Sequence, residues 1–470
     1  MFQKNKKYVF LFQFFDWFVA ILVWILFFSF RKKYVENFPL DIYQILGDDN
    51  FIYAIIILPI MWVIWYAFTG QYHKVYRQSR LRVVYKTFWQ SLIGVLAIFF
   101  VLLLDDQVGN YTKYYATFSF LLVAQFFFTT VCRLILLTFI KHKMAKGEIL
   151  TNAVIVGSKY KAKQFFDDFN RNPLVYGYDI KGVVGINGGV INAEGLPFLG
   201  NLASLEEICI KYNIEDVIIA VETKEHLFIN KIIISLSSLA VFIRIIPDFH
   251  DILSGSVNMR EVIGAPLIDI FPDAMPLWQQ NIKRLLDVVI SSVALIILFP
   301  FFIIIALTIK VTDKGSIFYS QLRVGKGGEM FRMYKFRSMK EDAEPNGPAL
   351  SADNDERITP LGKFMRKWRI DELPQFWNVL KGDMSLIGPR PERKYYIDLM
   401  SEKAPEVKHL QRVRPGLTSL GMVKFGYAQN VDEMIQRLKY DIIYIEKRSL
   451  GLDFKIFLYT LITLIRGRGK

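Results

Sequence analysis

Long apolar blocks separated by polar connections dominate the first third of this 470-residue chain. Four such blocks cover roughly residues 8–30, 51–69, 88–104 and 114–140. A helix needs ~20 apolar residues to cross a bilayer, and each block approaches or exceeds that length. The pattern predicts a bundle of four membrane-spanning helices over residues 1–147.

From residue 151 to residue 275 the pattern changes to short β-rich runs between polar, helix-like segments. The predicted strands are 153–156, 180–184, 216–221 and 241–246, and the predicted helices are 159–171, 203–212 and 224–238. Such alternation is typical of a small parallel, Rossmann-like α/β sheet. A dinucleotide site would need a glycine-rich turn after the first strand, but residues 157–162 read GSKYKA, with one glycine. The missing fingerprint favours a structural or regulatory module over a working dinucleotide site.

A fifth apolar run covers residues 288–309, with Pro300 near its middle. Proline removes a backbone donor and clashes with the preceding turn, so it kinks or breaks a helix. Basic residues flank the run on both sides: Lys283, Arg284, Lys310 and Lys314. We interpret 282–310 as a re-entrant helix that turns back at Pro300, which keeps residues 280–470 on the cytoplasmic side. A fifth spanning helix with a tolerated kink is the alternative.

The charges between the four blocks orient the bundle. Basic residues precede the first block, crowd the connection between the second and third, and follow the fourth: Lys4, Lys6, Lys7; Lys74, Arg77, Arg80, Arg82, Lys86; Lys141, Lys143, Lys146. The loop before the fourth block carries Asp105 and Asp106 instead, whereas Arg31, Lys32 and Lys33 argue for the opposite orientation. Weighed together by the positive-inside rule, these charges predict that both ends of the bundle face the cytoplasm.

Composition agrees with a membrane protein that has polar parts. Hydrophobic residues make up 53% of the chain and aromatic residues 15%, which is too apolar for an ordinary soluble enzyme. The net charge of +14 fits an anionic leaflet and phosphorylated substrates. No nucleic-acid motif accompanies that charge, so no nucleic-acid partner is expected. Cys132 and Cys209 are too few for a disulfide framework or a zinc site.

The candidate chemistry lies in residues 365–392, MRKWRIDELPQFWNVLKGDMSLIGPRPE. Here the adjacent acids Asp371 and Glu372 stand among Arg366, Arg369 and Arg390. Carboxylates among guanidinium groups suit chemistry on an anionic substrate such as a phosphate. A solvated salt-bridge network is the alternative for a cluster of this kind.

Three further motifs give the last 190 or so residues a close resemblance to a known family: FYSQLRVGKGGEMFRMYKFRSM (318–339), RPGLTS (414–419) and YDIIYIEKRSLGLDFKI (440–456). The chain resembles the bacterial polyprenyl-phosphate glycosyl-1-phosphate transferases of the monotopic phosphoglycosyl transferase superfamily. The resemblance implies the long form of that family: a four-helix transmembrane bundle, a cytosolic Rossmann-like module and a mostly helical catalytic domain with a re-entrant helix. One departure is Phe299, where many members carry a serine before the proline.

The resemblance also implies a two-step reaction at the bacterial inner (cytoplasmic) membrane. Asp371 would attack a UDP-sugar and release UMP, and undecaprenyl phosphate would then take the sugar phosphate from the aspartyl intermediate. Glucose or galactose is the expected sugar, feeding exopolysaccharide or capsule synthesis. Pro374 fits the first turn of a helix, so Asp371 is expected at a helix N-terminus, where it would be ionised. The α/β module could serve as a homodimer contact.

Basic residues of the same motifs would hold the substrate phosphates. Arg366 and Arg390 are the expected clamps, because a planar fork of donors matches phosphate oxygens. Lys335 and Arg337 alternate along a segment expected to be extended, so they point to one face. Each of these four could instead face anionic lipid. Arg414 could bind the nucleotide or merely brace a turn.

The roles of the acid pair stay open at the level of sequence. Glu372 could position a metal or assist proton movement, and Mg²⁺ is the expected ion, with Asp371 and Glu372 as candidate ligands. Two rival functions remain. One is an inactive membrane scaffold or sensor for polysaccharide assembly, and the other is a transferase without a covalent intermediate. The apolar segment 452–466 is expected to be an interfacial surface helix, or else an ordinary core helix.

Overall fold

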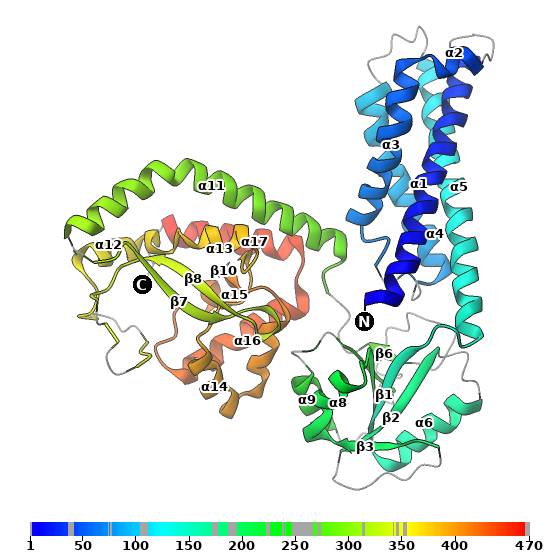
Figure 1. Ribbon diagram of the computed structural model, residues 1–470. Helices are drawn as coiled ribbons and strands as arrows, with labels where there is room; N and C mark the ends of the chain where they lie inside the picture. The colour runs from blue at the N-terminus through cyan, green and yellow to red at the C-terminus, as the bar shows by residue number, and fades with distance from the viewer. Residues whose placement is uncertain are drawn as a thin grey trace. The chain divides into compact units, whose positions relative to one another are not determined.

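The computed structural model describes residues 2–35, 42–73, 75, 78–103, 111–171, 177–186, 195–221, 226–236, 239, 241–246, 267–269, 274–312, 315–341, 343–344, 347–350 and 355–465. Figure 1 shows the elements of these parts of the chain. Some residues used above to orient the chain lie outside the described residues: Lys74, Arg77, Asp105, Asp106 and Lys314.

The N-terminal part is a set of long antiparallel helices that pack on one another (Figure 1). They are α1 (Phe2–Tyr34), the short α2 (Ile42–Leu46), α3 (Asp49–Phe68), α4 (Arg80–Ile98, extended by a π-turn over Phe99–Leu103) and α5 (Tyr111–Ala145). Side-chain caps define two of the helix starts, because Asp48 accepts the Asn50 N–H and Ser79 accepts the Arg82 N–H. Together with α11 (Leu277–Thr312), the four long helices are long and apolar enough to cross a membrane. These lengths and compositions fit a membrane protein.

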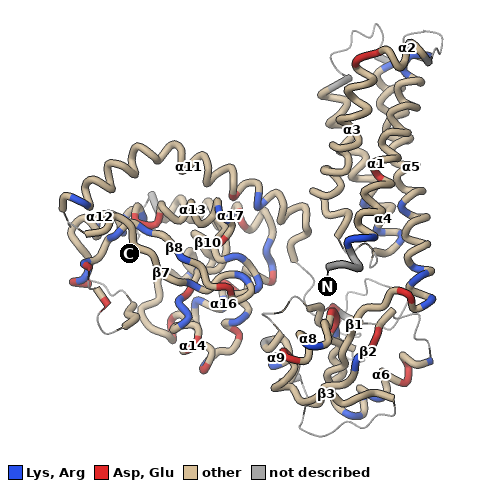
Figure 2. Tube along the Cα trace, in the orientation of Figure 1, with Lys and Arg blue, Asp and Glu red and all other residues tan. Residues whose placement is uncertain are grey.

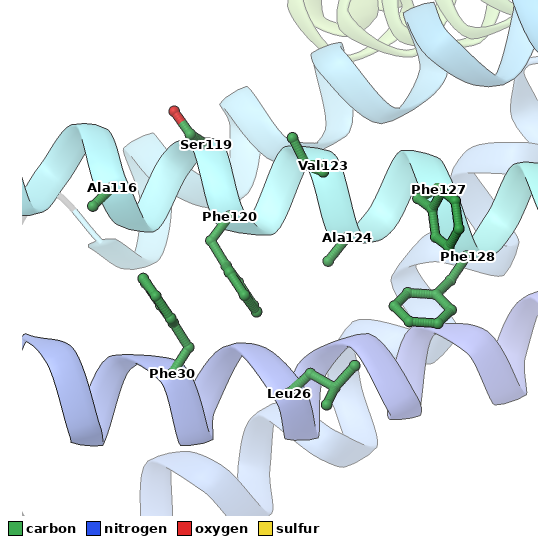
Figure 3. A pocket seen from close by; sticks show the side chains of 9 residues that line it. All are labelled: Leu26, Phe30, Ala116, Ser119, Phe120, Val123, Ala124, Phe127 and Phe128. Carbon is green, nitrogen blue, oxygen red and sulfur yellow. The ribbon is translucent and has the colours of Figure 1, made fainter.

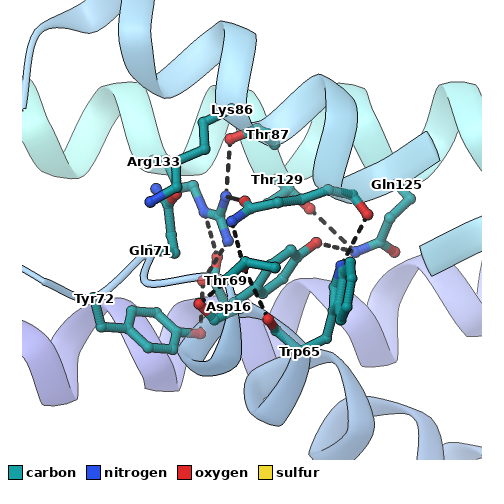
Figure 4. A network of polar contacts seen from close by, with 12 residues as sticks. Asp16, Trp65, Thr69, Gln71, Tyr72, Lys86, Thr87, Gln125, Thr129 and Arg133 are labelled. Carbon is teal, nitrogen blue, oxygen red and sulfur yellow. Dashed lines mark hydrogen bonds and ion pairs between the residues drawn. The ribbon is translucent and has the colours of Figure 1, made fainter. Parts of the chain in front are cut away.

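A network of polar side chains is buried between these helices. Arg133 of α5 is completely buried and donates to Asp16 of α1 and to Thr87 of α4, as Figure 4 shows. It also donates to Gln90 of α4 at 3.1 Å. Tyr72 donates to the same carboxylate of Asp16 at 2.9 Å. A buried charge is tolerable only when it is paired and hydrogen-bonded, and here both charges are.

An apolar cavity of about 520 Å³ lies between α1 and α5. Figure 3 shows its lining, in which Phe30 and Phe120 face each other across the two helices. Their rings stack with centroids 4.2 Å apart. Farther along, Leu26 and Ala124 border the same space.

The middle part is an α/β sheet, as the sequence predicts. Its strands follow the order β3-β2-β1-β4-β5-β6, and the pairs β1/β4, β2/β3 and β4/β5 are parallel while β5/β6 is antiparallel. The elements are β1 (Thr151–Gly157), α6 (Lys159–Arg171), β2 (Tyr178–Gly185), β3 (Phe198–Asn201), a 3₁₀ turn (Leu202–Ser204), α8 (Leu205–Lys211), β4 (Asp216–Ala220), α9 (His226–Ser235), β5 (Phe242–Ile245) and β6 (Ile268–Asp269). The four predicted strands and three predicted helices correspond to β1, β2, β4, β5, α6, α8 and α9, whereas β3 and β6 were missed.

The single glycine of the turn after β1 has a packing role. A Cβ at Gly157 would lie 1.9 Å from the carbonyl oxygen of Ala220 on the neighbouring strand β4. Only glycine permits the two backbones to approach this closely. The residue therefore needs no bound phosphate to explain it.

Helix α11 runs without interruption through Pro300 and arches over the C-terminal domain (Figure 1). The proline thus bends this helix rather than ending it, because it removes only one hydrogen bond of the helical ladder. Near its start Arg284 donates to the carbonyls of Val379 and Leu380 at 2.7 and 2.8 Å. Near its end, Ile305 and Ile309 belong to a buried cluster in the same domain.

The rest of the C-terminal domain is mostly helical. A hairpin of β7 (Phe318–Val324) and β8 (Met330–Phe336), joined by a 3₁₀ turn (Lys326–Gly328), precedes it. The other elements are α12 (Pro360–Lys367), a 3₁₀ turn (Ile370–Glu372), α13 (Gln375–Lys381), β9 (Ser385–Ile387), α14 (Lys394–Lys403), a 3₁₀ segment (Pro405–Arg412), β10 (Gly416–Thr418, parallel to β9), α15 (Leu420–Lys424), α16 (Val431–Lys447) and α17 (Leu450–Ile465).

Helix α17 combines the two alternatives drawn for segment 452–466. Ile456 is buried in the domain, while Phe454, Leu458 and Ile462 are exposed. One face therefore packs on the core and the other leaves apolar side chains uncovered. Residue 466 lies outside the described residues.

Candidate active site

A cavity of about 840 Å³ opens in the C-terminal domain between the β7–β8 hairpin, α12 and the segments around residues 390 and 430. Ten lysine and arginine side chains and six aspartate and glutamate side chains are among its lining residues. Figure 2 shows basic segments recurring along this domain, near β8, α12 and α16. The excess of positive charge makes the cavity suited to an anion.

Asp371 and Glu372 lie in the 3₁₀ turn that precedes α13, and both line the cavity. Arg369, which begins the turn, has left-handed backbone angles, φ 54° and ψ 27°. Pro374 is the N-cap of α13, and Asp371 comes three residues before it. Asp371 is therefore in a turn of its own rather than at the helix N-terminus that the sequence predicted.

Three cations surround Glu372. Lys335 Nζ lies 2.9 Å from Glu372 Oε1, while Arg369 Nη1 and Arg390 Nη2 lie 3.6 and 3.7 Å from its two oxygens. Burial alone would raise the pKa of Glu372, but Lys335, Arg390 and Arg369 together hold it well below its usual range. This carboxylate is ionised and already fully engaged by the protein.

Asp371 has the opposite electrostatic environment, although it is the direct neighbour of Glu372. Burial leaves only 6% of it exposed and raises its pKa above the ordinary value. Repulsion from Glu372 adds to that increase, and Lys335 and Arg366 oppose it. The sequence counted on a helix dipole to favour the ionised form of Asp371, whereas the structure buries this carboxyl in a turn, which raises its pKa.

Basic residues from two elements line the cavity beside this pair. Lys335 of β8 and Arg337 just after it both line the cavity. Residues two positions apart on an extended segment point to the same side, so this is the arrangement that the sequence predicts. Arg337 Nη1 donates to Glu341 at 3.1 Å, and Arg366 Nε donates to Ser338 at 3.1 Å. Both guanidinium groups line the cavity, and such groups bind phosphate oxygens.

Two residues singled out in the sequence lie elsewhere. Arg414 is exposed and is not among the residues that line the cavity. It lies near Arg284 and Asp287, so it belongs with the base of α11. Pro300 is within α11.

Sequence reasoning also missed several lining residues. Tyr427 stacks on two arginines, Glu392 pairs with Arg437, and Arg393 pairs with Glu344 through two hydrogen bonds of 2.8 Å. Arg323 Nη1 donates to the Pro391 carbonyl at 3.1 Å. Arg323 and Glu392 lie within the motifs 318–339 and 365–392, but no spacing rule singled them out, and the other missed lining residues lie outside the quoted motifs.

The donor set decides how a divalent cation would fit here. In the described part of the chain, no three acids, histidines or cysteines cluster as a metal site. Mg²⁺ is commonly held by one or two carboxylates together with substrate phosphates. Glu372 faces three cations, so Asp371, which has no ion pair among the described residues, is the carboxylate that fits such an ion.

Two family models match this sequence. The model described as bacterial sugar transferase matches residues 278–467, and the model described as CoA-binding domain matches residues 71–247. The first match contains every residue that lines the cavity.

Curated relatives match parts of this chain. A UDP-N-acetylgalactosamine-undecaprenyl-phosphate N-acetylgalactosaminephosphotransferase of Aeromonas hydrophila is 38% identical over 229 residues, 48% of this chain and 53% of that protein. A UDP-glucose:undecaprenyl-phosphate glucose-1-phosphate transferase of Caulobacter vibrioides is 40% identical over 185 residues, 39% of this chain and 69% of that protein.

A longer match extends into the N-terminal half. A UDP-glucose:undecaprenyl-phosphate glucose-1-phosphate transferase of Xanthomonas campestris pv. campestris is 29% identical over 380 residues, 79% of this chain and 78% of that protein. The chain spans about half the length of the Aeromonas relative.

Proposed function

Because the chain belongs to the bacterial sugar transferase family, we propose that it transfers a sugar 1-phosphate from a UDP-sugar to undecaprenyl phosphate, with release of UMP. The observation that carries the proposal is Asp371, a buried carboxylate on the wall of a cavity rich in cations. The names of the relatives support the substrate classes. The product would begin an exopolysaccharide or capsule chain.

In the first step, an ionised Asp371 oxygen attacks the phosphorus that carries the sugar. The bond from that phosphorus to the bridging oxygen breaks, and UMP leaves with the bonding electrons. The product is a sugar-phosphoryl-aspartate. Arg366, Arg390, Lys335 and Arg337 would stabilise the charge on the phosphate oxygens, which is where catalysis of phosphoryl transfer chiefly acts.

In the second step, a phosphate oxygen of undecaprenyl phosphate attacks the same phosphorus. The bond from phosphorus to Asp371 breaks and the carboxylate is restored. Lys335 at 2.9 Å and the two more distant arginines keep Glu372 ionised near neutral pH, so its role is to fix Lys335. Mg²⁺ held by Asp371 and substrate phosphates would neutralise charge on the diphosphate.

The packing of α11 supports a meeting of the two substrates at the cytoplasmic surface. If α11 crossed the bilayer, a hydrocarbon core of about 30 Å would separate its ends. Instead, Arg284 near its start and Ile309 near its end pack on one domain. Between them Ile296, Ile297 and Phe299 are exposed and apolar. We therefore propose a re-entrant α11 in the inner membrane with the C-terminal domain in the cytoplasm.

Single-turnover release of UMP tests the reaction. Full-length protein without lipid acceptor is mixed with a panel of UDP-sugars, with UDP-glucose and UDP-galactose expected to react best. Asp371→Asn should abolish the burst of UMP, whereas Asp398→Asn, an exposed residue of α14, should leave it unchanged. A normal burst from Asp371→Asn would favour a transferase without a covalent intermediate. No UMP from the wild-type protein, with acceptor and any UDP-sugar, would favour the inactive scaffold.

Labelling of single cysteines tests the topology. Ser316→Cys and Lys439→Cys place thiols at exposed positions of the C-terminal domain, in a background without Cys132 and Cys209. A membrane-impermeant maleimide should label them only after the inner membrane of spheroplasts is opened. Labelling of intact spheroplasts would place the domain outside the cytoplasm and overturn the re-entrant assignment.

A further inference from the structure

Tyr427, on the loop after α15, places its aromatic ring against two arginines of the cavity. The guanidinium carbons of Arg369 and Arg390 each lie 5.2 Å from the ring centroid. Tyr427 itself lines the cavity. Distances of this size allow a favourable cation–π interaction with each guanidinium.

The two arginines have little else to hold them near each other. Both are directed at Glu372, at 3.6 and 3.7 Å, distances too long for strong hydrogen bonds. Arg390 also donates to the sulfur of Met422 at 3.0 Å, a weak acceptor. Two like charges sharing one carboxylate repel each other. The electron-rich ring of Tyr427 relieves part of this repulsion.

The backbone of Arg369 indicates that this arrangement is built into the fold. Among the described residues, Arg369 and Asn213 are the only non-glycine residues with a positive φ. A left-handed conformation is unfavourable for arginine and persists only where the surroundings enforce it. It brings the Arg369 side chain and the Asp371–Glu372 turn to the same part of the domain.

We propose that Tyr427 is a positioning residue of this site: its ring keeps the guanidinium groups of Arg369 and Arg390 in place, so that Arg390 is presented to the diphosphate of the nucleotide sugar. This inference rests on the proposed function. Because the hydroxyl of Tyr427 is not required, phenylalanine or tryptophan can replace it. An aliphatic side chain of similar bulk cannot.

Steady-state kinetics of UMP formation by the full-length protein, with undecaprenyl phosphate and the best UDP-sugar, test the proposal. Tyr427→Leu should raise KM for the UDP-sugar about tenfold and change kcat by less than about threefold, since a lost binding contact weakens substrate and transition state alike. Tyr427→Phe and Tyr427→Trp should stay within about twofold of wild type. Tyr440→Leu, at a partly exposed tyrosine outside the cavity, is the matched control.

A double-mutant cycle separates positioning from a general effect on folding. If Tyr427 acts through Arg390, adding Tyr427→Leu to Arg390→Ala should raise KM by less than about twofold further. A full additional tenfold increase would show that Tyr427 acts independently and overturn the proposal. An unchanged KM in Tyr427→Leu, or a Tyr427→Phe defect equal to that of Tyr427→Leu, would do the same.

The two proposals fail in different ways. An inactive wild-type protein, with every UDP-sugar, contradicts the proposed function. An active wild type that is insensitive to Tyr427→Leu contradicts only the positioning role. Should Tyr427→Leu fold poorly, Tyr427→Trp with wild-type KM beside Tyr427→Met with raised KM tests the same requirement for a π face.

Discussion

Asp16 and Arg133 are 117 positions apart in the chain, yet they form a bidentate ion pair inside the N-terminal bundle. Arg133 Nε lies 3.0 Å from Asp16 Oδ1, and Arg133 Nη2 lies 2.8 Å from Asp16 Oδ2. Tyr66 covers the guanidinium with its ring, 4.1 Å from the centroid. The pair ties α1 to α5, and the hydrogen bond from Arg133 to Thr87 adds α4.

Asp16→Asn should destabilise the bundle strongly, by about 3–5 kcal/mol, because it leaves a buried guanidinium without its counter-charge. The double variant Asp16→Leu with Arg133→Leu should lose less, since no unpaired charge remains. Thermal unfolding of the full-length protein in detergent measures both. Asp49→Asn, at an exposed position of α3, serves as the control. A single variant as stable as wild type would contradict the importance of the pair.

The pH profile of kcat/KM should show an acid limb set by Asp371. Attack needs the carboxylate, and burial raises the pKa of Asp371, so the limb should lie above the ordinary aspartate value of about 3.9. Lys335→Met removes a cation that favours the ionised form, and so it should move the limb to higher pH. Lys403→Met, at an exposed lysine of α14, should not move it. A shift of the Lys335→Met limb toward lower pH would contradict this account.

Asp441 should make the C-terminal domain less stable as the pH rises. It is 2% exposed, and burial raises its pKa to about 6. The folded state therefore holds more protons than the unfolded state between about pH 4 and pH 6, so stability falls through that window by up to about 3 kcal/mol. Asp441→Asn removes this contribution. Relative to wild type, the variant should gain stability as the pH rises from about 4 to about 6, measured by thermal unfolding. An equal pH dependence in both proteins would refute the assignment.

Substitutions at Arg369 test whether the backbone is strained just ahead of Asp371 and Glu372 in the chain. Glycine accepts its left-handed angles without penalty while alanine does not, so Arg369→Gly should be about 1 kcal/mol more stable than Arg369→Ala. Both variants lack the guanidinium, and the comparison isolates the backbone. At Lys439, an exposed position within α16, the order should be reversed. Urea unfolding of the Gly and Ala variants at both positions measures the two differences in stability. The same order of Gly and Ala at Arg369 and Lys439 would contradict the prediction.

Local patterns foretold the secondary structure well. The long apolar blocks correspond to α1, α3, α4 and α5, because an uninterrupted apolar run of this length can be read directly. The predicted helix 159–171 coincides with α6, because burial on one face imposes a periodicity. Strand β3 escaped detection because its four residues FLGN carry no alternation. Strand β6, with two residues, is too short to leave a pattern.

The site was foreseen in part. The sequence indicated Lys335, Arg337, Arg366, Arg390 and the acid pair, and the structure gathers all of them around one cavity. It does not bring Arg414 there. The aromatic ring of Tyr427 and the raised pKa of Asp371 could not be foreseen, since both depend on which distant side chains surround a position.

By itself, the sequence determined where the chain can cross or enter a membrane, where the α/β module lies and which charged groups are available for chemistry. These properties follow from hydrophobic periodicity and residue type, which act over neighbouring positions. The tertiary structure alone decided which charges meet. Asp16 finds Arg133 in the bundle, Glu372 gathers three cations and Asp371 is left with a raised pKa, because solvation and Coulomb interactions depend on distances that only the folded chain fixes.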